Sequence, residues 1–176
     1  MIIKAPPRAS VNQALAYVLT RKPARANYVA QYIIELWRLC TKLGYDPTVL
    51  LAQAIYETTE DGIPFNSKWW IDTLNPAGIG ITDDGPQSNL VSISGVISAR
   101  AHFAHMAGYV EGIHGRSLIG TNYERLDPRW DALKWSGMAG TVSKVEDLGS
   151  GTWASQDSAI YSTKIIELVH QIARYG

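Results

Sequence analysis

The chain has 176 residues, a length that fits one domain, and 46% of them are hydrophobic, which is enough for an ordinary core. Acidic and basic residues balance to a formal net charge of zero, so the composition favours neither nucleic acid nor an anionic membrane as a partner. No run reaches the roughly 18 apolar residues of a membrane span, and "MIIKAPPRAS" lacks the apolar segment of a signal peptide. We expect synthesis in the cytoplasm and no membrane insertion.

The first part of the chain is predicted to be an extended arm followed by helices. Two prolines keep residues 1–9 extended, and Ser10 is a suitable N-cap for a helix over 11–21. Apolar residues then recur at helical spacing through "ANYVAQYIIELWRLCTKLG", and its last residue, Gly44, is a suitable C-cap. We therefore expect two helices before residue 45.

The third predicted helix ends in a carboxylate. Asp46 and Pro47 form a helix start, and Gln53 is the only polar residue between Val49 and Glu57. A helix that is apolar all round is buried, so a carboxyl at its end is partly desolvated and faces the negative end of the helix dipole. Both effects raise the pKa of Glu57, as general-acid catalysis requires. A solvated acidic helix end is the alternative.

The middle of the chain changes character. Residues 61–95 are rich in Gly, Pro, Asn, Asp and Ser, and "GIGIT" and "NLVSIS" are the only strand-like pieces, separated by the turn-like "TDDGPQSN". This pattern predicts a small β-hairpin lobe with loops. Helical patterns return afterwards and predict helices over 95–110, 127–133, 141–149 and 157–176, the last of them capped by Asp157.

Three segments in order carry a resemblance to a known family. "LLAQAIYET" ends in Glu57 and Thr58, "NPAGIGIT" follows about twenty residues later, and "TWASQDSAIYSTKI" contains Trp153 and Tyr161. The chain resembles the glucosaminidase family (glycoside hydrolase family 73) of the lysozyme-like superfamily, in the form found in bacteriophage lysins. One departure is "TTED" at 58–61, where that family has a small residue followed by Gly and Trp.

The resemblance implies a fold, an activity and a partner. It implies a mainly α, lysozyme-like single domain over 1–176, with a small β-hairpin lobe beside the cleft. It implies an endo-β-N-acetylglucosaminidase, an antimicrobial endolysin type of hydrolase that cuts bacterial peptidoglycan glycan strands after N-acetylglucosamine. We expect a monomer that needs no cofactor and reaches the cell wall after release during lysis or from a virion. A muramidase, a lytic transglycosylase and a non-catalytic wall-binding or virion component remain alternatives.

The resemblance also implies roles for individual residues. Glu57 is the expected catalytic acid, and the lobe acids Asp83 and Asp84 are the candidates for a second carboxylate that activates water. A route in which the substrate's own acetamido group attacks needs no second carboxylate and stays open. The expected substrate-binding residues are Trp70, Asn75, Trp153 and Tyr161. The four histidines have no partners that predict a metal site.

Overall fold

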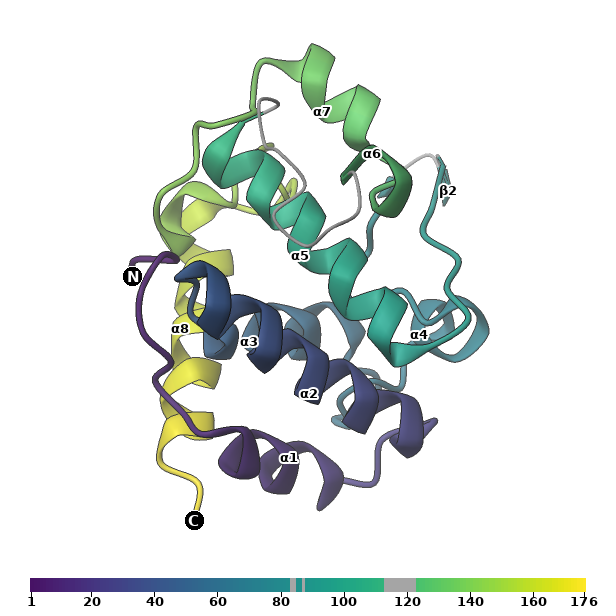
Figure 1. Cartoon of the computed structure of the whole chain (residues 1–176), viewed down its shortest axis with the longest axis vertical. Coiled ribbons are helices and arrows are strands. Elements are labelled where there is room, and N and C mark those ends of the chain that lie inside the picture. The colour runs from purple at the N-terminus through teal and green to yellow at the C-terminus, as the bar shows by residue number, and fades with distance from the viewer. Residues whose placement is uncertain (83–84, 87, 113–122) are drawn as a thin grey trace.

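The computed structural model describes residues 1–82, 85–86, 88–112 and 123–176, and its regular structure is almost entirely helical (Figure 1). This confirms the predicted mainly α fold. The elements in chain order are α1 (Val11–Leu19), α2 (Ala26–Leu43), α3 (Pro47–Thr58), α4 (Lys68–Thr73), β1 (Ile81–Thr82), β2 (Gly85–Pro86), α5 (Gly95–Glu111), α6 (Tyr123–Leu126), α7 (Trp130–Ser136), the 3₁₀ helix η1 (Val145–Asp147) and α8 (Ser158–Ala173).

Helix α3 is the central helix of the core. It begins as predicted, because the Asp46 side chain accepts a hydrogen bond from the Thr48 N–H at 2.9 Å and Pro47 occupies the first turn. Its side chains are buried on all sides, and it packs against α2 and α8. An apolar helix enclosed in this way carries the residues of its last turn into the interior, and Glu57 is one of them.

Helix α8 starts where the sequence predicts and brings a second functional candidate to α3. The Asp157 side chain caps the helix by accepting hydrogen bonds from the N–H groups of Ala159 and Ile160. Tyr161 lies in the first turn that follows and is only 1% exposed. Because α8 packs along α3, this cap determines where Tyr161 meets the end of α3.

The region predicted as a β-hairpin lobe is organised differently. The strands β1 and β2 have two residues each and pair antiparallel, and "NLVSIS" at 89–94 forms no strand. Instead, the N–H of Leu90 donates to the Ile79 carbonyl, while Val91 and Ile93 are 68% and 86% exposed. The alternation of apolar and polar residues that predicted a strand therefore comes from an irregular segment. The described residues do not show the predicted lobe, and α4 forms inside the range that was assigned to it.

Other boundaries also differ from the predictions. The helix expected over 127–133 begins only at Trp130, after a turn in which the Asp127 carboxylate accepts from the Arg129 N–H and contacts His105, and the Asp127 carbonyl accepts from the Trp130 N–H. The helix expected over 141–149 is only the 3₁₀ turn η1. The arm is extended as predicted, and Ile2 pairs with Lys144 in an isolated β-bridge.

None of the described helices combines the length and the hydrophobicity that crossing a membrane would take.

Candidate functional site

Glu57 lies at the wall of a cavity of about 410 Å³. Its side chain is half-buried at the end of α3, where burial raises the pKa of the carboxyl from an ordinary 4.5 to about 7. The predicted rise in pKa is therefore confirmed, and desolvation is its main cause. A carboxyl of this kind holds its proton close to neutral pH and can give it up to a bound group.

Tyr161 is the hydrogen-bond partner of Glu57. Its hydroxyl donates to Glu57 Oε1 at 2.5 Å, which favours the ionised carboxylate and partly offsets the effect of burial on the pKa of Glu57. Burial, and then the neighbouring Glu57 charge, raises the pKa of Tyr161 well above its ordinary value, so the hydroxyl keeps its proton. Since Tyr161 is buried, it contacts the acid and not the cavity. Tyr161 was expected to bind substrate directly, and the structure instead places it where it supports Glu57 by a hydrogen bond.

The raised pKa of Glu57 predicts a pH-dependent stability. In the unfolded chain the carboxyl ionises near 4.5, and in the folded chain it ionises near 7. Between these values the folded state binds one more proton, so rising pH lowers the free energy of unfolding. This contribution to the free energy of unfolding is on the order of 3 kcal/mol. It is fully present below pH 4.5 and is lost as the pH rises through 7.

The measurement is chemical denaturation of the wild type and of Glu57→Gln from below 4.5 to above 7. Because glutamine does not titrate, the difference between the two proteins isolates Glu57. We expect the variant to gain stability relative to the wild type as the pH rises. A difference that stays constant across this range would contradict a raised pKa for Glu57.

One wall of the cavity is the segment that follows α4. Ala77, Gly78 and Ile81 line it, and a Cβ atom at Gly78 would lie 3.5 Å from Glu57 Oε2. Gly78 has a φ of +59°, and the absence of a side chain keeps the approach to Oε2 open. The segment therefore passes over the carboxyl on the side of Oε2, opposite the bond to Tyr161.

Asn75 holds this wall in place from the interior. Its side-chain amide donates to the Ile79 carbonyl at 2.9 Å, and its side-chain oxygen accepts from the Ile79 N–H at 3.0 Å. Asn75 is completely buried, and it does not line the cavity. Asn75 therefore does not bind substrate as predicted, and its side chain instead closes the loop that carries Gly78.

The two adjacent tryptophans of α4 point in different directions, and the expected one is not at the cavity. Trp70 is completely buried, its indole N–H donates to the Ala24 carbonyl at 3.1 Å, and its ring packs on Tyr32 and Phe65. Trp69 lines the cavity beside Glu57. The choice of Trp70 as a substrate-binding residue is wrong, because successive residues on a helix face about 100° apart and the core takes Trp70.

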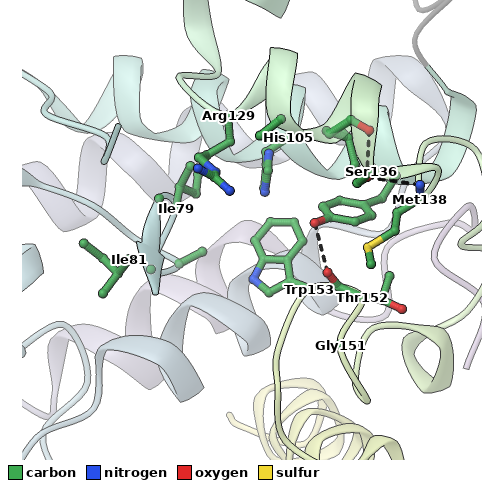
Figure 2. A pocket seen from close by; sticks show the side chains of 15 residues that line it. Ile79, Ile81, His105, Arg129, Ser136, Met138, Gly151, Thr152 and Trp153 are labelled. Atoms are coloured by element: carbon green, nitrogen blue, oxygen red, sulfur yellow. Dashed lines mark hydrogen bonds between the residues drawn. The ribbon is translucent and has the colours of Figure 1, made fainter. Parts of the chain in front are cut away.

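Trp153 lies between the cavity of Glu57 and a neighbouring cavity of about 270 Å³. Figure 2 shows its ring beneath His105 and between Ile81 and Thr152. The ring centroid lies 4.6 Å from that of His105 and 5.4 Å from that of Tyr109. Because both cavities share Trp153, Ile81 and the Gly78 segment, they adjoin each other, and together they make the candidate substrate groove. The structure thus places Trp153 in the same cavity wall as Glu57.

The sequence offered two lobe acids as candidates for a second carboxylate. Asp83 and Asp84 lie outside the described residues. Among the described residues that line the cavity, Glu57 is the only carboxylic acid. The described part of the chain also contains no group of His, Cys, Asp and Glu that could hold a metal ion.

Two residues of the site, Trp69 and Gln53, are missing from the sequence-based predictions, and only Gln53 has a signal that could have identified it. Trp69 and Trp70 are equivalent by sequence pattern, and only the packing of α4 separates them. Gln53 lies four residues before Glu57 on the same face of an apolar helix, and it is completely buried. A single polar residue at that spacing indicates a buried hydrogen-bond network that leads to the acid.

No protein family model, no curated protein and no solved structure matches the chain. The geometry of the site and the motifs of the sequence therefore supply the evidence for a function.

Proposed function

We propose that the protein is a peptidoglycan hydrolase that cleaves the glycan β-1,4 bond after N-acetylglucosamine, with Glu57 as the general acid. The observation that carries the proposal is a half-buried carboxyl with a pKa of about 7 in an open groove. Trp69 and Trp153 line the same cavity and offer the apolar surface that packs on pyranose rings. The three motifs that resemble the glucosaminidase family support the same activity and a lysozyme-like fold.

The proposed reaction begins with proton transfer from Glu57 to the oxygen that links two sugars. The bond from that oxygen to the anomeric carbon breaks, and positive charge develops on the sugar ring as an oxocarbenium-like state. Ionised Glu57 is then stabilised by the hydroxyl of Tyr161, whose hydrogen bond favours the charged form. Glu57 can afterwards accept a proton from the attacking water, which regenerates the acid.

The second half of the reaction has two routes. Glu57 is the only acid among the described cavity-lining residues, which favours attack by the substrate's own 2-acetamido group with retention of configuration. A water activated by Asp83 or Asp84 would instead invert the anomeric centre. The configuration of the first product, read by NMR during digestion, distinguishes the routes.

The experiment that tests the function is digestion of purified peptidoglycan followed by analysis of the new ends. A reducing N-acetylglucosamine end is the expected product. A reducing N-acetylmuramic acid end would identify a muramidase, and an anhydro product a lytic transglycosylase. Binding to the wall without any new end would overturn the proposal in favour of a non-catalytic wall-binding or virion component. A biological role in release of bacteriophage through the host wall belongs to the same proposal.

Trp153→Ala is expected to weaken glycan cleavage. Loss of one aromatic face should cost about 1–3 kcal/mol of transition-state binding, a loss of roughly fivefold to 150-fold in kcat/KM. The measurement is the rate of release of reducing ends together with the melting temperature, because Trp153 also packs on His105 and Tyr109. A lower melting temperature with unchanged specific activity would mean that Trp153 only supports the core.

A further inference from the structure

A chain of four hydrogen bonds runs through the core and ends on Glu57. The Tyr32 hydroxyl lies 2.6 Å from His102 Nδ1, and His102 Nε2 lies 2.9 Å from Gln53 Oε1. The Gln53 side-chain amide donates to the Tyr161 hydroxyl at 3.1 Å, and that hydroxyl donates to Glu57 Oε1 at 2.5 Å. The only member of the chain that reaches the cavity is Glu57.

The chain joins helices that are far apart in the sequence. Tyr32 comes from α2, Gln53 from α3, His102 from α5 and Tyr161 from α8, and none of these four is more than 1% exposed. Polar groups enclosed in this way need partners, because an unsatisfied one is costly. Apolar side chains of similar size would fill the same space without that requirement, so packing alone does not call for this network.

The direction of the hydrogen bonds follows from the inner end of the chain. Burial, together with the neighbouring His105, lowers the pKa of His102 to about 3, so one ring nitrogen of His102 carries a proton and the other accepts. With the proton on Nε2, His102 donates to Gln53 and Nδ1 accepts from the Tyr32 hydroxyl. His102, Gln53 and Tyr161 then each accept a hydrogen bond from the preceding member of the chain and donate one to the next member on the way to Glu57. Tyr32, at the inner end, only donates.

The opposite direction would leave a buried donor unsatisfied. His102 would then donate from Nδ1 to the Tyr32 oxygen, and the hydroxyl proton of Tyr32 would have no other acceptor among the described residues. At the outer end, Tyr161 would donate to Gln53 and accept from Glu57 Oε1. The acid proton would therefore be held on the oxygen that faces the core and would be unable to reach the cavity.

We propose that Tyr32, His102 and Gln53 are positioning residues that direct the Tyr161 proton onto Glu57 Oε1 and thereby keep the acid proton on Oε2. Oε2 is the oxygen next to Gly78, and Gly78 lines the cavity together with Glu57. The catalytic consequence depends on the proposed function, but the position of the proton does not. A chain of aligned hydrogen bonds strengthens each member, so its inner residues act on an acid that they do not touch.

The sign of a change in the pKa of Glu57 tests the direction of the chain. When Tyr161 donates to the carboxylate, it stabilises the ionised form, so weakening the chain raises the pKa of Glu57. When Tyr161 accepts from the protonated acid, weakening the chain lowers this pKa. We expect Gln53→Met to raise it by about one unit and Tyr32→Phe to raise it by a smaller amount.

The measurement is an NMR titration of isotope-labelled glutamate carboxyl carbons, with Glu57→Gln to assign the Glu57 signal. Tyr17→Phe is the matched control, because it also removes the hydroxyl of a buried tyrosine, here one that donates to Gln171 at 2.7 Å and lies outside the chain. The control should leave the titration of Glu57 unchanged. Since Tyr32→Phe keeps the buried ring, it carries the test even if Gln53→Met does not fold.

A lowered or unchanged pKa of Glu57 in folded Gln53→Met or Tyr32→Phe would overturn the proposal. Under the proposed function, the same variants should also reduce kcat by about threefold to tenfold with little change in KM, and the control should not. If the pKa of Glu57 rises in the variants but the wild type releases no glycan ends, the proposed role of the hydrogen-bond chain stands and the proposed function fails. If the wild type cleaves glycan and the pKa of Glu57 does not rise in the variants, the proposed role of the hydrogen-bond chain fails and the proposed function stands.

Discussion

Glu57→Gln is expected to lower the rate of glycan cleavage by on the order of 10²–10⁴-fold while the fold is retained. Glutamine has nearly the same shape as glutamate, and its side-chain oxygen can still accept the hydrogen bond from Tyr161. It cannot supply a proton to the leaving oxygen, so only the acid function is removed. The measurement is the release of reducing ends from purified cell walls, with circular dichroism to verify the fold.

Glu60→Gln is the control for this experiment. Glu60 lies three residues further along the chain and is exposed, and it is not among the residues that line the cavity. Its replacement should leave cleavage close to that of the wild type. Retention of more than about a tenth of the wild-type rate by Glu57→Gln would show that Glu57 is not the general acid. The wild-type rate should also fall as the pH rises through about 7, since the acid must be protonated.

Trp70→Ala is expected to lower the free energy of unfolding by about 3–5 kcal/mol. The indole is completely buried among the rings of Tyr32 and Phe65, and its N–H is bonded to a backbone carbonyl. Truncation therefore removes apolar contacts, leaves a cavity and deprives the Ala24 carbonyl of a donor. Chemical denaturation measures the loss, and Trp70→Phe gives a smaller loss if the alanine variant does not fold.

Trp69→Ala is the matched variant, because the same residue type is removed one position earlier on the same helix. Trp69 lines the cavity and is only partly buried, so its loss should reduce cleavage more than stability. Specific activity per folded molecule should be unchanged in the Trp70 variants. If Trp70→Phe lowered specific activity without lowering stability, the assignment of Trp70 to the core would be wrong.

The long helices were predictable because their start and stop signals are local. Asp46 and Asp157 cap helices where the sequence indicated, and Gly44 ends α2 in a left-handed conformation. The raised pKa of Glu57 was predictable for a related reason, since an apolar helix carries its last turn into the core. These inferences depend only on neighbours within a few residues.

The rest of the site depends on which face of an element meets which neighbour. "NLVSIS" alternates as a strand does, but no strand among the described residues pairs with it, and two of its apolar residues are exposed. Asn75 has the composition of a ligand-binding residue, and its amide is used up by the backbone of Ile79. The choice between Trp69 and Trp70 requires the orientation of α4 against α2. Such facts belong to tertiary packing, which local patterns do not encode.

The hydrogen-bond chain that ends on Glu57 has a consequence for protein engineering. Its inner residues are buried polar groups in a core that is otherwise largely apolar, and these are the positions that a search for thermostable variants would replace first. Replacing the buried members together by apolar residues of similar size would raise heat resistance while removing the proposed control over the acid proton, whereas leucine at Gln53 or His102 alone would leave buried neighbours unpaired. A library screened only for survival on heating would therefore select against the proposed activity at positions remote from the groove. Screening for heat resistance and wall lysis together would retain these residues.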